Sequence, residues 1–411
     1  MIVGLGGAVA STAIAGIELI KQKKIGKEGL PLAELPEEIT SGIAEYENLV
    51  FTGWDMNGDN LALAATTHNV LTLQQFSAVS EELQAAKPLA AVVNAAFCHN
   101  IEGKNVFAAA NHNAAVEKLR EDIRRFKNEA GAERVVVINL ASTESFVDKD
   151  SPTFASLENF EKSLGENSAE ISPAMIYAYA AIGEGIAYGN FTPSVAADIP
   201  ALVEYAEKKG VPVAGKDGKT GQTFIKTVIA PGLKARALKV DGWFSTNILG
   251  NRDGFALKHP DSLKSKITTK GSVLDDILGY KVEDHLVDIR YYRPRGDNKE
   301  AWDNIDVIGF MGQPMQLKIN FLCKDSILAA PLVIEIARLL DYAQKCGEKG
   351  VQTQLSTFFK LPQVTDETSD TPEHAIHNQQ QMLIDWLKLR AAAQTGAEEN
   401  QPNKSAAATA E

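Results

Sequence analysis

The order of apolar and polar positions divides the chain into two regions with different patterns, which meet near Thr223. Before this point, short apolar runs typical of strands alternate with segments of helical period. The strand-like runs are 2–3, 48–51, 89–93, 134–140 and 211–214, and the helical segments include 8–20, 113–130, 173–187 and 196–209. Strands that alternate with helices indicate βαβ units, so this part predicts an α/β fold with a doubly wound, mostly parallel sheet.

After Thr223 the strand-like runs are longer and follow one another at 240–249, 286–293, 305–310 and 315–322. This order favours a second sheet with antiparallel pairing. Helical period returns in 327–342 and 372–389, whereas the Ala-, Gln- and Asn-rich end has little to bury and is predicted to be disordered. We therefore expect four segments: an α/β domain over 1–223, a strand-rich domain over 224–326, a return to the first core over 327–390, and a tail over 391–411.

Composition narrows the possible partners of the protein. The 411 residues include 41 Lys and Arg against 53 Asp and Glu, which gives a net charge of −12. Sequence-independent binding to nucleic acid or anionic lipid needs a basic surface, so we expect neither partner. No run approaches the ~18 apolar residues of a membrane-spanning helix. Three cysteines, odd in number and far apart, favour the reducing cytoplasm over a disulfide framework.

A glycine-rich turn follows the first predicted strand. Gly4-x-Gly6-Gly7 between a strand and a helix is typical of backbone that approaches a pyrophosphate, although the usual third glycine is replaced by Val9. An acidic residue that binds the adenosine ribose is expected roughly 20 residues later. The best candidate, Asp55, comes much later than that. Either 25–47 is an insertion, or Asp55 is an ordinary loop carboxylate.

The loop 215–223 has two interpretations. Its Gly-Lys-Thr resembles part of a Walker A loop, but the glycine spacing is wrong, so a nucleoside triphosphate site is not favoured. A loop of glycines and hydroxyls at the carboxyl end of a strand is a suitable place for a ligand. It also fits a plain helix start with Thr220 as N-cap.

One lysine differs from the many that we expect on the surface. Lys360 lies within Phe358-Phe359-Lys360-Leu361-Pro362, whose apolar neighbours would bury its stem. A desolvated lysine can act as an acid, a base or an anion partner. The seven histidines are scattered, and His374 and His377, on a polar helix start, are more consistent with solvated residues than with metal ligands. The sequence has no serine-hydrolase elbow and no zinc motif.

Several of these stretches occur in an order that resembles the myo-inositol-1-phosphate synthase family. The matching segments span nearly the whole chain at 3–7, 53–55, 215–223, 247–254, 265–276, 296–299, 324–332 and 359–362. The chain departs from the family in lacking the long N-terminal extension of eukaryotic members. It also has Ala8 and Val9 in place of two asparagines, Lys216 in place of an acid, and Arg252 in place of an asparagine. These departures resemble a shorter, prokaryotic-type branch.

The resemblance implies a Rossmann-type NAD-binding domain with an inserted α+β domain for tetramerisation and catalysis. The implied reaction is the NAD-dependent, redox-neutral cyclisation of D-glucose 6-phosphate to 1L-myo-inositol 1-phosphate, which serves inositol and phospholipid biosynthesis in the cytoplasm. Whether a divalent metal or a monovalent cation assists stays open. The alternatives are an NAD-dependent sugar-phosphate dehydrogenase, or a non-catalytic sensor of NAD or sugar phosphate.

The resemblance also assigns roles to residues. Lys266 is the implied acid and base at the C5 oxygen, and Lys360 neutralises the C5 oxyanion. Lys270 and Lys299 clamp the phosphate, while the acids Asp217 and Asp325 orient the lysines. The implied cofactor positions are Gly4, Gly6, Gly7, Ala8 and Val9 at the pyrophosphate, Asp55 at the ribose, Ala141, Ser142, Thr143, Gly189, Asn251 and Asp253 toward the nicotinamide, and Asp217, Thr220, Asp297 and Ser326 nearby.

Overall fold

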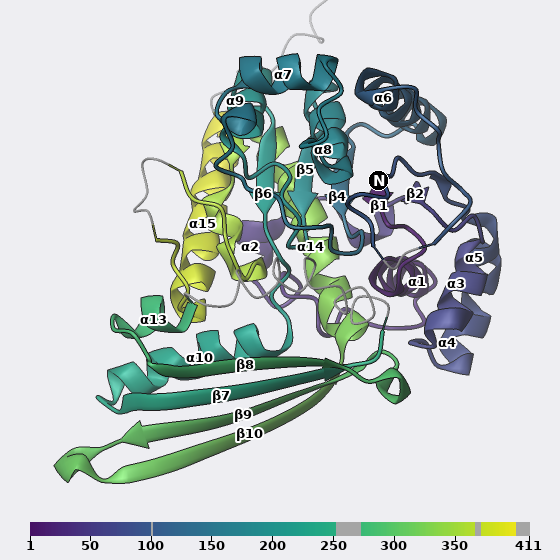
Figure 1. The fold of residues 1–411 in the computed structure, drawn as a ribbon. Helices are drawn as coiled ribbons and strands as arrows, with labels where there is room; N and C mark the ends of the chain where they lie inside the picture. Colours follow the sequence, from purple (N-terminus) through teal and green to yellow (C-terminus); the bar gives the residue numbers. More distant parts are fainter. Residues whose placement is uncertain (100–101, 252–272, 366–370, 400–411) are drawn as a thin grey trace, which may run out of the picture.

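The computed structural model describes residues 1–99, 102–251, 273–365 and 371–399 (Figure 1). The larger of its two main sheets has seven parallel strands in the order β11-β6-β5-β4-β1-β2-β3. The strands are β1 (Ile2–Val3), β2 (Gly53–Asp55), β3 (Leu89–Ala90), β4 (Val136–Asn139), β5 (Ala187–Asn190), β6 (Pro212–Gly215) and β11 (Gly350–Val351). The predicted doubly wound sheet is confirmed, and the direction of winding reverses between β1 and β4.

Helices cover both faces of this sheet, because the side chains of its strands point alternately to the two faces and are apolar on both. Val137, Tyr188 and Val213 belong to the core under α6, α8 and α9, whereas their neighbours Ile138, Ala187 and Ala214 pack with α14. The helices are α1 (Ala8–Lys21), α2 (Glu37–Thr40), α3 (Leu61–His68), α4 (Leu73–Ala78), α5 (Ser80–Ala85), α6 (His112–Ala130), α7 (Leu157–Gly165), α8 (Pro173–Gly183), α9 (Pro200–Lys209), α10 (Gly221–Ala235), α13 (Val273–Leu278), α14 (Asp325–Lys345) and α15 (Ile376–Glu399).

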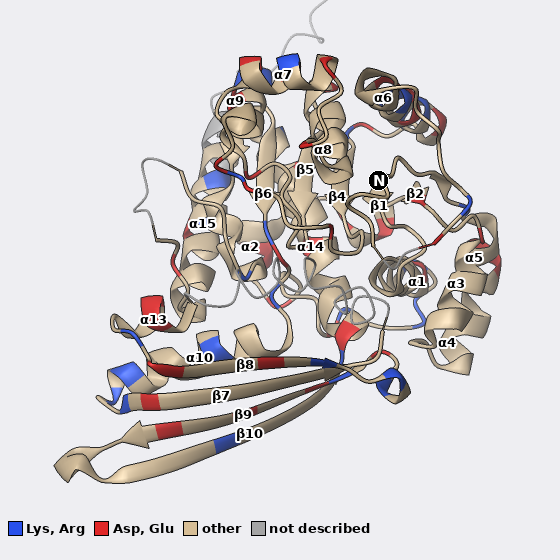
Figure 2. Cartoon of the chain, viewed as in Figure 1, with Lys and Arg blue, Asp and Glu red and all other residues tan. Residues whose placement is uncertain are grey.

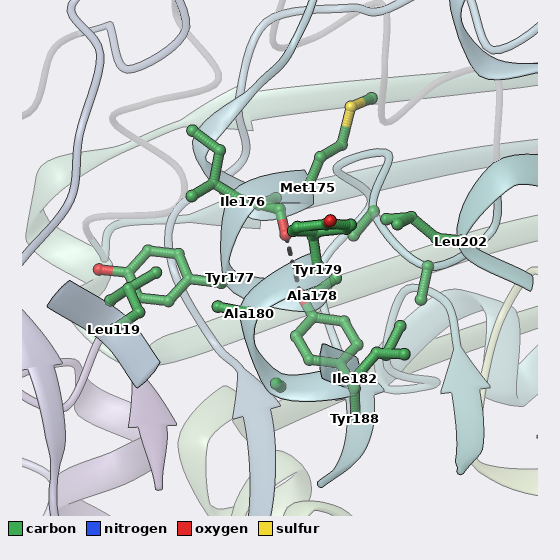
Figure 3. Close-up of a cluster of buried hydrophobic side chains, with 14 of the residues drawn as sticks. Leu119, Met175, Ile176, Tyr177, Ala178, Tyr179, Ala180, Ile182, Tyr188 and Leu202 are labelled. Atoms are coloured by element: carbon green, nitrogen blue, oxygen red, sulfur yellow. Dashed lines mark hydrogen bonds between the residues drawn. The ribbon is translucent and has the colours of Figure 1, made fainter. Parts of the chain in front are cut away.

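The centre of the largest core is α8, which is apolar on all sides (Figure 3). Every residue from Pro173 to Ile182 is buried, as expected of a helix that has no solvent face. Its polar atoms find partners: the Tyr177 hydroxyl accepts from Val92 N at 2.9 Å, and the Tyr188 hydroxyl donates to Ala174 O at 3.4 Å. This helix therefore forms a fixed wall beside β4 and β5.

The second sheet has four strands in the order β10-β9-β7-β8. They are β7 (Lys239–Leu249), β8 (Asp284–Tyr291), β9 (Asn298–Ile308) and β10 (Pro314–Lys324). The predicted antiparallel pairing holds for β10-β9 and β9-β7, whereas β7 and β8 are parallel. Helices α10 and α13 cover one face around Trp243 and Ile305. Phe244, Leu286 and Leu322 are 37%, 57% and 61% exposed on the opposite face, which is uncovered in the single chain.

Several predicted boundaries differ from the structure, and four of them have a local reason. The strand expected at 48–51 lies at Gly53–Asp55 instead, and the helix expected to reach 187 ends at Gly183 so that β5 can begin. The helix expected from 196 starts at Pro200, because proline suits the first helical turn. The tail expected from 391 is wrong at its start, since α15 continues to Glu399 through alanines that favour a helix.

Candidate functional site

A cavity of about 690 Å³ lies at the carboxyl ends of the parallel strands, a size typical of ligand pockets. Residues that follow β1, β2, β4, β5 and β6 line it, and the start of α14 with the start of β9 closes one side. In doubly wound sheets this edge, at the point where the winding reverses, is where ligands bind. Most of the predicted site residues line this cavity: Gly4, Gly6, Gly7, Ala8, Val9, Asp55, Ala141, Ser142, Thr143, Asp217, Thr220, Asn251, Lys299, Asp325, Ser326 and Lys360.

The glycine turn connects β1 to α1 as predicted. Gly4 has a φ of +87°, and a Cβ there would lie 3.0 Å from the backbone of Ala141, so only glycine fits without strain. Gly7 is the N-cap of α1, which has no capping side chain and no acidic residue in its first turn among the described residues. The first N–H groups of a helix have no carbonyl partner within it, so this end of α1 is suited to an anion.

Asp55 is the last residue of β2, beside β1. Its Oδ2 accepts from Gly6 N at 2.8 Å, and its Oδ1 accepts from Asn57 N at 2.8 Å. Of the two interpretations of Asp55, the structure therefore favours a strand-end carboxylate next to the glycine turn, with 25–47 inserted between α1 and β2.

Lys360 reaches the same cavity from the far end of the chain. Its side chain is 5% exposed, and its Nζ donates to Asp217 Oδ1 at 2.7 Å. The two backbones also pair, because Lys360 N donates to Asp217 O at 2.6 Å. The predicted burial of Lys360 is confirmed, and its partner is one of the two acids that the resemblance assigned to the lysines.

Lys299 occupies a second ion pair in the cavity. Its Nζ lies 3.1 Å from Asp325 Oδ1, and Thr220 Oγ1 donates to the same oxygen at 3.2 Å. Asn251 Nδ2 is 3.4 Å from the other carboxylate oxygen of Asp325. Thr220 is the N-cap of α10 as predicted, but its hydroxyl makes no cap bond and instead points to α14. The loop 215–223 is thus joined to both ion pairs.

Two predicted cofactor residues lie outside the cavity lining. Asp297 supports the site from behind, since its carboxylate accepts from Ser326 Oγ at 2.6 Å and from Ser326 N at 3.2 Å. Burial raises the pKa of Asp297 above its usual value. Gly189 faces α14, where a Cβ would lie 2.7 Å from Ile138 and 3.1 Å from Leu340. Its role in the structure is therefore close packing of helix on sheet. Asp253, Lys266 and Lys270 lie outside the described residues.

Glu144 is a cavity residue that sequence reasoning missed. It is 5% exposed, and its Oε1 accepts from Ala174 N at the start of α8 at 3.0 Å. Burial raises the pKa of Glu144 to about 7, and it raises the pKa of the neighbouring Cys98 thiol to about 12. The only signal in the sequence is position, because Glu144 directly follows Thr143 after β4.

Three further buried lysines lie outside the cavity, and one of them, Lys216, pairs with Asp198 Oδ2 at 2.6 Å. Lys219 Nζ bonds to Gln379 Oε1 on α15, and burial lowers the pKa of Lys219 to about 7. Lys226 Nζ lies 2.6 Å from His285 Nε2, and burial lowers the pKa of Lys226 to about 8. His374 was expected in solvent but is 2% exposed, with its Nε2 3.4 Å from Asp276. That expectation was wrong, because α13 of the other sheet covers the start of α15.

Basic and acidic residues are interspersed along the same elements, on α6 and α7 for example (Figure 2). Among the described residues, no three His, Cys, Asp or Glu side chains are grouped so that they could hold a metal ion. None of the helices in this part of the chain is long and apolar enough to cross a membrane.

Comparison with known sequences gives a consistent result. The profile of the family described as myo-inositol-1-phosphate synthase matches residues 38–388. The chain is 42% identical over 410 residues to inositol-3-phosphate synthase 1 of Bacteroides thetaiotaomicron, with 94% of each chain covered. It is 32% identical over 326 residues to inositol-3-phosphate synthase of Saccharomyces cerevisiae, covering 74% of this chain and 61% of the yeast protein.

Solved structures agree with this result. Inositol-3-phosphate synthase of Caenorhabditis elegans superposes with a TM-score of 0.87 at 27% identity, covering 98% of this chain and 88% of the other. A myo-inositol-1-phosphate synthase-related protein of Thermotoga maritima superposes with a TM-score of 0.78 at 26% identity, covering 94% and 97%. The likeness therefore includes both sheets.

Proposed function

Since the chain belongs to the myo-inositol-1-phosphate synthase family, we propose that it cyclises D-glucose 6-phosphate to 1L-myo-inositol 1-phosphate with NAD as a catalytic cofactor. The observation that carries this proposal is one cavity with two parts. A dinucleotide-type glycine turn lies at one end, and the ion pairs Lys360–Asp217 and Lys299–Asp325 lie at the other. A dehydrogenase or a sensor needs the first part but has less need of two buried ammonium groups.

The residues of the first part fit NAD. The N–H groups at the start of α1 suit its pyrophosphate, and the carboxylate of Asp55 at the end of β2 suits a ribose hydroxyl pair. The residues 141–143 after β4 lie where the nicotinamide end would extend, toward the lysines. When bound, NAD supplies a hydride acceptor at C5 of the sugar and returns the hydride at the end, so the reaction is redox-neutral.

Lys360 is proposed to stabilise negative charge on the C5 oxygen. The reaction passes through an enolate and an alkoxide, and a fixed ammonium in a dry cavity stabilises such charge without reorganising. Asp217, 2.7 Å away, holds Lys360 in position and offsets the cost of burying its charge. By resemblance, Lys266 is the acid and base at the C5 oxygen, and Lys360 helps with the proton transfers.

Lys299 is proposed to bind the phosphate of the substrate, with Lys270 as its partner by resemblance. Pinning the phosphate brings the two ends of the open sugar together, which lowers the entropic cost of ring closure. Thr220 and Asn251 bond to Asp325, so the carboxylate that orients Lys299 is itself fixed from two further segments. The hydrogen bond from Ser326 to Asp297 fixes the start of α14, where Asp325 lies.

Assembly and location extend the proposal. Phe244, Leu286 and Leu322 are apolar side chains exposed on the uncovered face of the four-stranded sheet, which supports a homotetramer formed through this sheet. The three cysteines are free thiols, which suits the cytoplasm. Light scattering at micromolar concentration tests the assembly, and a monomer would contradict it.

The test of the reaction is incubation with glucose 6-phosphate and NAD⁺, followed by phosphorus NMR and by absorbance of reduced nicotinamide. We expect inositol phosphate without net accumulation of NADH. Net accumulation of NADH would show a dehydrogenase instead, and cofactor binding without any product would show a sensor.

A further inference from the structure

Gly6, at the centre of the glycine turn, is held by side chains on both of its backbone polar groups. Its N–H donates to Asp55 Oδ2 at 2.8 Å, and its carbonyl oxygen lies 2.9 Å from His68 Nε2. Asp55 comes from the end of β2 and His68 from the end of α3, so two separate elements meet on one residue. Both side chains line the cavity.

The chemistry of this contact assigns the proton on His68. A carbonyl oxygen can only accept a hydrogen bond, so Nε2 must carry the hydrogen. His68 therefore donates to Gly6 O, either as the neutral Nε2–H tautomer or as the imidazolium.

The geometry points to His68 as a positioning residue for the pyrophosphate of the dinucleotide, an inference that rests on the proposed use of NAD. The Gly6 carbonyl and the Gly7 N–H share one peptide plane, and the Gly7 N–H donates to Gly4 O at 3.0 Å. His68 and Gly4 thus hold both ends of the peptide that immediately precedes α1. The first-turn residues Ala8, Val9 and Ala10 line the cavity, and their N–H groups have no carbonyl partner within the helix.

The element that carries His68 is itself fixed to α1. Asn60 caps α3 by accepting from Leu63 N at 3.0 Å, and Asn69 ends the helix in the left-handed conformation. Leu61 and Ala65 of α3 pack in one apolar cluster with Ala10 and Ile14 of α1. His68 is therefore delivered to Gly6 from a rigid support, as pre-organisation of an anion site requires.

His68→Ala tests the inference, with NAD binding followed by titration calorimetry on the full chain. Loss of one neutral hydrogen bond should weaken NAD binding about three- to tenfold. The kcat at saturating NAD and the melting temperature should stay near wild type, because His68 is half-buried and its contact with Gly6 lies at the turn, away from the ion pairs of the lysines. His68→Gln retains a side-chain N–H donor and should restore much of the affinity.

His112 offers a matched control. Its Nε2 makes the same kind of contact, 2.8 Å from Ser168 O, but it does not line the cavity. His112→Ala should leave NAD affinity unchanged. Equal affinities in wild type, His68→Ala and His112→Ala would overturn the inference, and so would a His68→Gln variant as weak as His68→Ala. Wild-type protein that binds NAD but forms no inositol phosphate would contradict the proposed function and leave the role of His68 intact. Wild-type protein that binds no NAD would overturn both.

Discussion

Two pairs of buried lysines lie close to the loop 215–223 and differ in their partners. Lys360 and Lys299, in the cavity, are 5% and 7% exposed and each pairs with a carboxylate. Lys219, in the loop, is 5% exposed and contacts Gln379. Lys226, on α10, is 2% exposed and contacts His285. Burial is thus nearly equal in all four, and the partner is what differs.

The difference shows that burial alone does not give a lysine a fixed positive charge. The pKa of Lys219 falls to about 7 and that of Lys226 to about 8, because burial disfavours the ammonium and, among the residues that the structure describes, no carboxylate forms an ion pair with either lysine. Burial and Lys226 lower the pKa of His285 to about 4, so this partner is neutral near neutral pH. In the cavity, Lys360 and Lys299 instead each have a carboxylate within 3.1 Å, from Asp217 and Asp325.

The largest expected effect comes from removing the ammonium of Lys360. Lys360→Met keeps an apolar stem and should lower kcat by about 10²–10³, as loss of one preorganised electrostatic partner commonly does. Steady-state assay of inositol phosphate measures this. Because the substitution removes the ammonium that pairs with the buried Asp217, the double variant Asp217→Asn/Lys360→Met serves as a stability control. Activity of Lys360→Met within a few-fold of wild type would contradict the role.

Lys299→Met should act mainly on binding of glucose 6-phosphate. Loss of a charge-assisted contact of about 1.5–3 kcal/mol predicts a KM raised about tenfold or more. Inorganic phosphate should also inhibit the variant less than it inhibits wild type, which the two inhibition constants measure. Lys127→Met, on an exposed position of α6, is the control. Identical phosphate constants in all three proteins would return Lys299 to a purely structural role.

Lys219→Met should change how stability depends on pH. Between pH about 7 and the unfolded value of 10.5, the unfolded chain holds a proton on this lysine that the folded protein has released. Wild-type stability therefore gains up to about 1.4 kcal/mol per pH unit over this window, and the variant lacks that gain. The difference between the two proteins in urea unfolding from pH 7 to 9 isolates it from other groups. A constant difference would show that Lys219 stays charged.

Lys226→Met should give the smallest effect of the four. The pKa of Lys226 is lowered only to about 8, so the pH range over which this lysine changes the stability is narrower than for Lys219. The same unfolding series should show the slope difference beginning about one pH unit higher than for Lys219→Met. Catalytic constants should remain near those of wild type, since Lys226 does not line the cavity. Loss of activity comparable to that of Lys360→Met would remove the distinction between the two pairs.

Local patterns were enough to predict the glycine turn, the parallel sheet and the burial of Lys360. Each of these depends on near neighbours: Gly4 to Gly7 lie between a strand and a helix, and Lys360 lies between apolar residues. The exact strand that ends at Asp55 was misplaced by a few residues, because Asn48 to Phe51 are as apolar as the true strand.

Features that depend on distant parts of the chain could not be predicted in this way. The sequence Ala187 to Asn190 has no strand-forming bias, and it becomes β5 because β4 and β6 pair on either side. The buried state of His374 depends on Asp276, and that of Glu144 on the start of α8. The acids Asp217 and Asp325 were assigned by family resemblance, since nothing in the spacing of the residues pairs them with Lys360 and Lys299.

The hydrogen bond between Thr220 and Asp325 has a consequence for the order in which the molecule assembles. It joins residues 105 positions apart. The chain therefore leaves the main body to form the four-stranded sheet, and returns to it, at two neighbouring residues. During synthesis this segment emerges before α14 and β11, which complete the larger sheet. The Lys360–Asp217 pair, 143 positions apart, forms later still. A nascent chain therefore has a glycine turn long before it has a reaction site, and the cavity is completed only when Lys360 has emerged, with α15 still to follow.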